Sequence, residues 1–471
     1  MNLNMIVSVR FTRYACILVL VCMLVLPAVY GLRAEDSSTT LDAETVDAPR
    51  DVAVARFMAG MTKVDITPDV NAQPVPLQGY FDRHRKPAVS VHDPLYARAL
   101  VVEDPSGNRI AVVGVDLCYV HSEVRDRVVD RLSPYGFGEH NLLIAATHTH
   151  SGFGAFDSRF LADKIFSKFN PRMLDQAVFG ISTAVLQAEQ AMTQVEVEIG
   201  STQLKGMNRS RRDPAFDFDV GGTGEKIEFN PEKYPTDRTL TVIRFVNMDS
   251  EPIGLLYNFS SHPTILSPKN MALSADWPGV AAEKIEKHLG QGAVVMFVNG
   301  SLGDAAPTPD WDELEIEWKN VHEYGDQMAD HVISLLDSLK PMERKDVKAR
   351  TQRREFTKLV LRGLGRMRLP KCISKAGYKR PDQPIQAMRL GDAIFLAVPG
   401  EPTTLVGNEL KSLCRKDFHC MIAAPSNGYL AYFTMPEEYE EGGYASDSTL
   451  FGPKSASWIR QSMSRALAHV Q

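Results

Sequence analysis

The fold prediction begins at residues 142–152, which read Leu-Leu-Ile-Ala-Ala-Thr-His-Thr-His-Ser-Gly. The first five of these residues are apolar and predict a buried β-strand. Two imidazoles follow at His148 and His150, beyond the end of that strand, where open α/β sheets place their ligands. Because neutral imidazole is a common ligand for zinc, the stretch indicates either a metal site or two hydrogen-bonded histidines in a turn.

Patterns of strands and helices alternate along the rest of the chain. Apolar or alternating runs predict strands over residues 61–67, 97–102, 110–115, 142–146, 239–246, 254–259, 293–298, 393–398 and 420–424. Amphipathic spacing predicts helices over residues 122–132, 173–192, 276–288, 314–339, from 403 onward, and 455–469. This order predicts an α/β fold with a mixed β-sheet core flanked by helices, and a metal site at the C-terminal ends of strands.

The N-terminus predicts export. Two arginines precede a charge-free run of 12 residues, Ala15–Leu26, which is too short for a membrane span and suits the core of a signal peptide. We expect a signal peptide over residues 1–34, either cleaved after Gly31 or Ala34 or retained as an anchor. A polar, flexible leader is expected over residues 35–54. The expected location is therefore periplasmic, secreted or membrane-anchored.

Composition restricts the class of protein and the kinds of metal ligand. The 471-residue chain is 44% hydrophobic and 23% charged with a net charge of -6, which is typical of a globular protein and gives no sign of nucleic-acid binding. Four cysteines follow the predicted signal: Cys118, Cys372, Cys414 and Cys420. They form no Cys-x-x-Cys pair, so a metal site must use histidine, carboxylate or phenolate ligands. Cys414 and Cys420 are close enough for a local disulfide, but the sequence does not fix the pairing.

Further ligand-type residues follow other predicted strands. The strand over residues 254–259 runs into His262, the strand over 393–398 leads to Glu401, and the strand over 420–424 leads to Tyr429 and Tyr432. Two imidazoles with one carboxylate form a familiar zinc set that leaves open positions for water and substrate. Each residue alone is compatible with a structural role, and it is their recurrence at strand ends that favours one shared site.

These residues carry a resemblance to the neutral ceramidases. The matching motifs occur in the family's order: Thr147–Gly152, Met207–Ser210, His262–Thr264, Gly303–Asp304, Pro399–Thr404 and the C-terminal signature Tyr432–Gly452. The likeness spans about residues 61–460 and implies a neutral ceramidase-like catalytic domain over residues 55–471.

The resemblance also implies roles for particular residues. It implies one zinc ion, Zn2+, with four ligands: His148, His262, Glu401 and Tyr432. It implies that three further residues bind the substrate carbonyl and the oxyanion: His150, Arg209 and Tyr444. An imidazole, a guanidinium and a phenol around zinc would stabilise a tetrahedral oxyanion.

Two features depart from the family's pattern. The family's nucleophile is the serine of a Gly-Asp-x-Ser-Pro loop, and Ala306 stands in its place here, with Ser301 too far along the chain to substitute simply. We therefore expect zinc-bound water to attack the amide, with Asp304 or a neighbouring group handling protons. The chain also ends shortly after the signature, without the family's C-terminal immunoglobulin-like domain, which weakens the case for membrane ceramide as substrate.

The sequence thus predicts a zinc-dependent hydrolase of carboxamides, with an N-acyl sphingoid or another N-acyl lipid as its first substrate. The alternatives are a zinc esterase or lactonase on the same scaffold, and a lipid- or ligand-binding protein that keeps the zinc pocket without turnover. The expected partner is a small-molecule or lipid amide. Contact with a membrane surface is compatible with this function, no nucleic acid is expected, and the oligomeric state stays open.

Overall fold

The structure is a computed structural model that describes residues 56–83, 85–159, 167–216, 230–290, 292–308, 318–356, 359–362, 366–368 and 382–471. The chain divides into a unit of residues 1–55 and a unit of residues 56–471. The predicted signal peptide and leader lie outside the described residues, as does Cys372. The fold is therefore that of the second unit.

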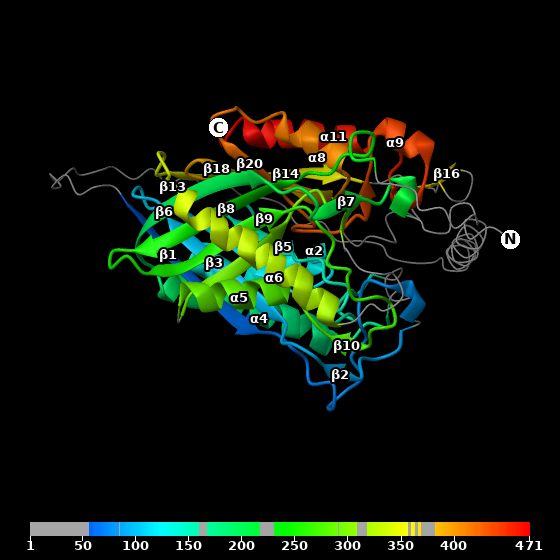
Figure 1. The fold of residues 1–471 in the computed structure, drawn as a ribbon, viewed down its shortest axis with the longest axis horizontal. Coiled ribbons are helices and arrows are strands. Elements are labelled where there is room, and N and C mark those ends of the chain that lie inside the picture. Colours follow the sequence, from blue (N-terminus) through cyan, green and yellow to red (C-terminus); the bar gives the residue numbers. More distant parts are fainter. Residues whose placement is uncertain are drawn as a thin grey trace, which may run out of the picture. The chain divides into compact units, whose positions relative to one another are not determined.

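A nine-stranded mixed sheet forms the centre of this unit (Figure 1). Its order is β11-β9-β8-β6-β1-β3-β4-β5, with β13 paired to β6. The β4–β5 and β9–β11 pairs are parallel, and the other pairs are antiparallel. The strands are β1 (Phe57–Asp65), β3 (Tyr96–Glu103), β4 (Arg109–Val115), β5 (Leu142–Ala146), β6 (Thr193–Gln203), β8 (Thr239–Asn247), β9 (Pro252–Phe259), β11 (Val294–Asn299) and β13 (Lys340–Pro341).

A second sheet packs on one face of the first. Its order is β14 (Val347–Glu355), β17 (Asp382–Leu390), β18 (Ala393–Ala397) and β20 (His419–Ala423). Successive side chains of a strand point to opposite faces, so Leu100 and Val102 of β3 face this second sheet, where they share a core with Met388 and Phe395. The intervening Val101 joins a different core, on the helical side of the large sheet.

Helices cover the two outer faces, so the layers run helix, sheet, sheet, helix (Figure 1). The large sheet is covered by α2 (Ser122–Leu132), α4 (Pro171–Gln190), α5 (Trp277–Leu289) and α6 (Trp318–Leu335). The second sheet is covered by α8 (Thr404–Lys411) and α11 (Ser455–Leu467). The helices α9 (Pro436–Glu441) and α10 (Tyr444–Asp447) are short. Among the described residues, no helix combines the length and the apolar character that crossing a membrane requires.

Short strand pairs and 3-10 turns complete the unit. The pairs are β2 (Ser90–Val91) with β10 (Ala272–Leu273), β7 (Asn208–Ser210) with β12 (Ala305–Pro307), β15 (Val360–Leu361) with β16 (Met367–Arg368), and β19 (Glu401–Pro402) with β21 (Tyr432–Phe433). The turns are η1 (Phe81–Arg83), η2 (Ser133–Tyr135), η3 (Pro214–Phe216) and η4 (Leu336–Ser338).

The two edge strands of the large sheet, β5 and β11, are brought together by the residues that follow β20. Ala146 N donates a hydrogen bond to Pro425 O, and Ala424 N donates to Asn299 O. The Asn299 side chain also donates to Thr147 O at 3.1 Å. The turns that follow β5, β11 and β20 therefore meet, and the candidate site forms there.

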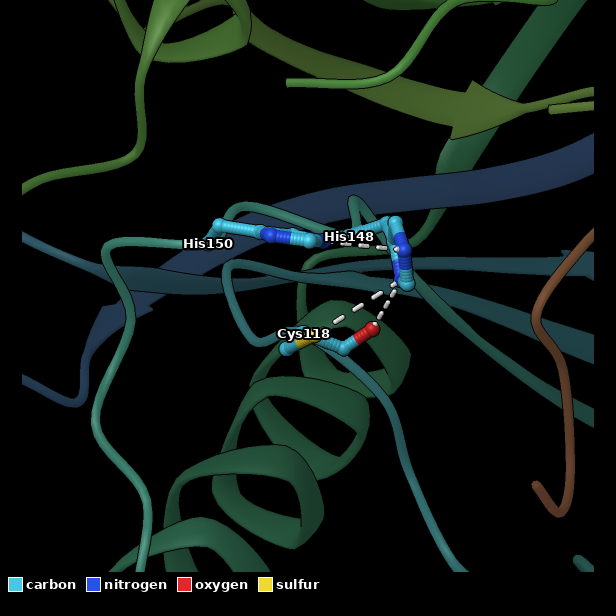
Figure 2. Close-up of side chains that lie close together, drawn as sticks. All are labelled: Cys118, His148 and His150. Carbon is cyan, nitrogen blue, oxygen red and sulfur yellow. Dashed lines mark hydrogen bonds between the residues drawn. The ribbon is translucent and has the colours of Figure 1, made fainter. Parts of the chain in front are cut away.

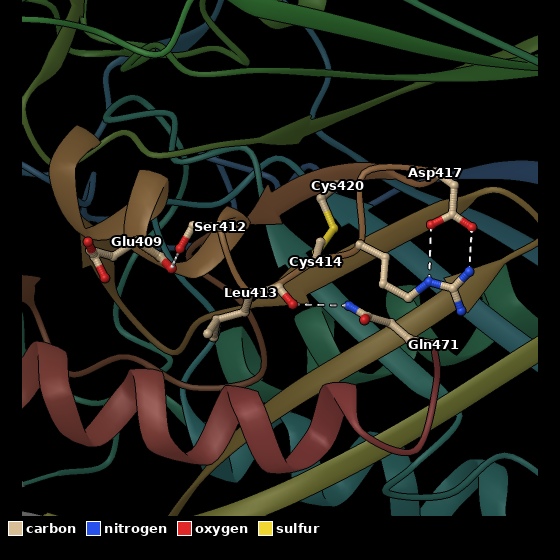
Figure 3. The surroundings of a disulfide bond; sticks show 8 residues. Glu409, Ser412, Leu413, Cys414, Asp417, Cys420 and Gln471 are labelled. Atoms are coloured by element: carbon tan, nitrogen blue, oxygen red, sulfur yellow. Dashed lines mark hydrogen bonds and ion pairs between the residues drawn. A yellow bond between two sulfur atoms is a disulfide. The ribbon is translucent and has the colours of Figure 1, made fainter.

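A disulfide links Cys414, just after α8, to Cys420 at the start of β20 (Figure 3). The Gln471 side chain donates to Leu413 O at 3.4 Å, which joins the C-terminus to the same turn. The local bridge that the sequence left open is thus formed. Cys118 is a free, buried thiol.

The predicted fold class, a mixed sheet flanked by helices, is confirmed. The boundaries differ in places: the strand expected from residue 61 begins at Phe57, because Phe57–Ala59 pair with β6 and Met58–Gly60 extend the pairing with β3. The helix expected over residues 314–339 is described over Trp318–Leu335, and the start of the predicted range lies outside the described residues. The strands β6 and β17 were not predicted.

Candidate metal centre and active site

His148 lies in the turn that follows β5 (Figure 2). Its φ of 73° is in the left-handed region, which is uncommon for a residue with a side chain. Hydrogen bonds from Thr147 N to Val115 O and from His148 N to Leu117 O hold this turn. The Nδ1 atom donates to the Cys118 carbonyl at 2.5 Å, so the Nε2 atom keeps its lone pair for another partner.

His262 follows β9 and is fully buried. Its Nδ1 atom and its backbone N–H both donate to Ala305 O at 3.0 Å. Ala305 belongs to β12, which pairs with β7, so this small strand pair orients the imidazole. The Nε2 atom again presents a lone pair, and Arg211 Nη1 lies 3.2 Å from it.

Glu401 completes the cluster from the second sheet's side of the unit. Its Oε2 atom lies 3.5 Å from His148 Nε2 and 3.2 Å from His262 Nε2. The ligand atoms of the three residues lie within 4.8 Å of one another. Oε2 is buried and accepts no hydrogen bond from the described residues, whereas Oε1 accepts one from the Tyr429 hydroxyl at 2.5 Å.

This arrangement fits a metal ion. Two imidazole lone pairs and one unsatisfied carboxylate oxygen converge on one point, and backbone carbonyls fix both rings in the tautomer that a metal ligand needs. A buried oxygen without a donor is costly, and a cation would satisfy it. The structure therefore holds a candidate site for one divalent ion formed by His148, His262 and Glu401.

The charges in the cluster agree with this geometry. Burial and then the Arg211 charge lower the pKa of His262 to about 3, so its imidazole is neutral near pH 7. Burial disfavours the charged form of Glu401, but the two imidazoles outweigh it and hold the carboxyl pKa well below its usual range. Burial also lowers the pKa of His148, but interactions with Cys118 and Glu401 outweigh it and raise the value to about 10. Without a metal, a proton on His148 thus balances Glu401.

His150 stands beside His148 (Figure 2). Its Nε2 atom lies 3.2 Å from His148 Nε2, and its ring packs edge-on against Tyr80 with ring centroids 4.6 Å apart. A Cβ at Gly79 would lie 2.5 Å from the ring of His150, so this approach requires glycine. Burial and the neighbouring imidazoles keep the pKa of His150 well below its usual value, so the ring is neutral near pH 7. Cys118, His148 and His150 form a second group with ligand atoms within 4.8 Å.

Two tyrosines line the other side of the cluster. The backbone of Tyr432 in β21 pairs with Glu401 in β19, and its side chain is buried. Burial and the Glu401 carboxylate raise the pKa of Tyr432 well above its usual value, so the phenol stays protonated. Tyr444 packs edge-on against Tyr432 with ring centroids 5.5 Å apart and is 55% exposed, which puts it at the rim.

The predicted residues Arg209, on β7, and Asp304, directly before β12, have other surroundings. Arg209 pairs through its backbone with Ala306, the residue that the resemblance places at the family's serine. Asp304 Oδ1 accepts hydrogen bonds from Thr404 N at 2.7 Å and Thr404 Oγ1 at 2.9 Å, at the N-terminus of α8. Burial and Glu438 raise the pKa of Asp304 to about 7. These contacts tie Asp304 to α8, and its role in proton handling stays a prediction.

Sequence reasoning missed Arg211 and gave too little weight to Tyr429. Arg211 Nη1 lies 3.2 Å from His262 Nε2, and its Nη2 donates to Thr264 Oγ1 at 3.1 Å. The strand-end pattern offered Tyr429, and the resemblance then favoured Tyr432. Nothing in the local sequence distinguishes Arg211 from its neighbouring arginines.

Fold and site together define an α/β protein with a candidate metal centre where strand ends meet. A model of the neutral/alkaline non-lysosomal ceramidase N-terminal family matches residues 57–310 and 318–461. The chain belongs to this family. It is accordingly a hydrolase of amide bonds, and the predicted enzyme class is confirmed.

Similar proteins carry the same family name. The chain is 24% identical to a neutral ceramidase of Pseudomonas aeruginosa, over 88% of this chain and 72% of that protein. It is 24% identical to a neutral ceramidase of Drosophila melanogaster, over 86% of this chain and 73% of that protein. The crystal structure of the Pseudomonas aeruginosa neutral ceramidase superimposes with a TM-score of 0.74 at 22% identity, covering 88% of this chain and 74% of that one. This last likeness concerns the fold alone.

Proposed function

We propose that the protein is a zinc-dependent amidohydrolase of ceramide-like N-acyl lipids. Family membership supports the amide reaction, and the curated relatives are named neutral ceramidases. The observation that carries the metal is the convergence of His148 Nε2, His262 Nε2 and Glu401 Oε2, the last buried without a donor among the described residues. Two imidazoles and a carboxylate with an open position form a donor set that catalytic zinc uses.

The chain's own residues would orient the substrate. Zinc, when bound, supplies Lewis acidity toward the amide carbonyl and lowers the pKa of water. The neutral ring of His150 turns its Nε2 atom toward His148 Nε2, 3.2 Å away, which puts this atom beside the proposed metal ligands, where the substrate carbonyl would bind. Tyr432, whose backbone pairs with that of Glu401, stays the proposed fourth metal ligand. Tyr444 at the rim is suited to contact the part of the substrate nearer to solvent.

Water, rather than a side chain, is the proposed nucleophile. Ala306 has no nucleophilic atom, it is buried, and its strand is held against Arg209. An acyl-enzyme at position 306 is therefore impossible in this chain. Intact-protein mass spectrometry during turnover should find no acylated protein. An acyl adduct on the wild-type chain would contradict the proposal, and an adduct that forms only in Ala306→Ser would reveal a vestigial serine pathway.

Ala306 also favours one alternative, which is a lipid-binding protein that keeps the metal and lacks turnover. A zinc esterase or lactonase is the other enzyme that this site could serve. The distinguishing experiment incubates the zinc-loaded chain with ceramide, with esters and with lactones, and measures the products by mass spectrometry. Release of sphingosine that a chelator abolishes and zinc restores supports the proposal. Metal-dependent release from esters alone would replace it with the esterase, and zinc binding without any product would replace it with the binding protein.

Export and contact with a membrane surface remain part of the proposal. The N-terminal pattern of a signal peptide and the lipid character of the proposed substrate support them. Fractionation of cells that express the full chain, with N-terminal sequencing of the exported form, tests the location directly.

A further inference from the structure

Arg211 brings a guanidinium to the candidate metal ligands. Its main chain is fixed beside β12, because Arg211 N donates to Asp304 O at 2.6 Å. Its side chain reaches His262 Nε2 at 3.2 Å and Thr264 Oγ1 at 3.1 Å. We propose that Arg211 is a catalytic residue that binds the negatively charged oxygen of the reacting acyl group. This inference rests on the proposed function and adds a cation that the family resemblance does not include.

The Arg211 charge has no acidic partner in the part of the chain that the structure describes. The next residue provides the contrast, since Arg212 lies 3.6 Å from Glu438 and 2.5 Å from Glu441. A half-buried guanidinium without a carboxylate is costly unless a bound anion compensates it. Its two contacts use only two of its five N–H donors, and a metal on His262 Nε2 would free one of these two. The side chain is therefore equipped to hold an anion supplied by a ligand.

The position of this charge matches the charge that amide hydrolysis creates. In the overall reaction one water oxygen adds to the carbonyl carbon and the C–N bond breaks, which yields a carboxylate and a protonated amine. Negative charge develops first on the carbonyl oxygen and ends on the carboxylate. A guanidinium beside His262 lies next to the proposed metal ligands, where the scissile amide has to bind, and it complements both charges.

The first test measures binding without turnover. Dodecanoate and its neutral counterpart dodecanamide are titrated calorimetrically into the zinc-free full chain. The proposal predicts that Arg211→Gln weakens dodecanoate binding about tenfold or more and leaves dodecanamide binding unchanged. Arg211→Lys should retain part of the dodecanoate affinity, and Arg460→Gln, which removes an exposed arginine paired with Glu409, should retain all of it. Equal losses for both ligands, or no loss, would overturn the proposal.

The second test measures kinetics in the zinc-loaded chain with a neutral ceramide. Arg211→Gln should lower kcat by roughly 100-fold with little change in KM, because the guanidinium acts on charge that forms during the reaction. An unchanged kcat would refute the assignment even if the proposed function holds. If the wild type turns over no amide, the proposed function fails, and the dodecanoate titration still decides whether Arg211 binds an acyl carboxylate.

Discussion

The hydroxyl of Tyr429 offers a sharp test of how the metal centre is built. It donates to Glu401 Oε1 at 2.5 Å, and Glu401 Oε2 faces the two histidines. Removing a hydrogen bond to a charged group costs about 1.5–3 kcal/mol, and each 1.4 kcal/mol is tenfold in an equilibrium constant. Loss of this bond leaves the carboxylate less well oriented, so Tyr429→Phe should raise the zinc dissociation constant by roughly 10- to 100-fold.

The assay is a competition titration against a fluorescent zinc indicator at neutral pH. Tyr439→Phe is the matched control, because its buried hydroxyl has no partner among the described residues. The ring of Tyr429 remains in Tyr429→Phe and keeps its stacking on Tyr119, where the ring centroids are 4.3 Å apart. Equal zinc affinities for wild type, Tyr429→Phe and Tyr439→Phe, in proteins with the same thermal unfolding, would refute the role given to this bond.

Three further predictions concern the surroundings of the site. Burial raises the pKa of Asp304 from 3.8 to about 7, so its stabilising effect is complete below pH ~4 and is lost as the pH rises through 7. Urea unfolding of Asp304→Asn at about pH 4.5 and pH 8 should remove up to ~3 kcal/mol of that pH dependence, and an unchanged dependence would assign it to other groups. A Cβ at Gly303 would lie 2.7 Å from Glu401 O, so Gly303→Ala should lower the free energy of unfolding by about 1–3 kcal/mol and weaken zinc binding. Normal zinc affinity in that variant would show that the loop moves without Glu401. Replacing Cys414 and Cys420 by serine opens a loop with a sequence separation of 6 and should cost roughly 2 kcal/mol in urea unfolding without changing zinc affinity.

The ligand-type residues were predictable because each follows a strand that the sequence marks clearly. The runs before His148 and His262, residues 142–146 and 254–259, are fully buried, and their apolar character is visible without any homologue. Glu401 follows β18 of the other sheet. The resemblance joined these three residues into one set, and the structure brings their side chains within 4.8 Å.

The strand β17 could not be read from the sequence because polar residues interrupt it. Its burial pattern is almost complete, yet it contains a proline and two glutamines. Gln386 is satisfied by remote partners, since it donates to His140 O at 2.6 Å and accepts from Asn427 Nδ2 at 2.9 Å. Such compensation depends on tertiary contacts. The strand β6, in contrast, could have been predicted, because the alternation of Val195, Val197 and Ile199 is visible in the sequence.

The contact of Arg211 with His262 could not be predicted from the sequence for a similar reason. Its partner His262 is 51 residues further along the chain, and three arginines occur within residues 209–212. The pairing of β7 with β12 and the bond from Arg211 N to Asp304 O decide which guanidinium reaches the cluster. Local sequence carries neither piece of information.

The most direct test of the metal centre is the zinc content of three purified proteins after dialysis against trace zinc. We predict one zinc ion per chain in the wild type and in His469→Ala, which removes an exposed histidine outside the site. We predict a loss of bound zinc in His148→Ala, because His148 supplies one of the three converging ligand atoms. Equal zinc in all three proteins, or none in the wild type, would contradict the assignment of His148, His262 and Glu401 as the metal site.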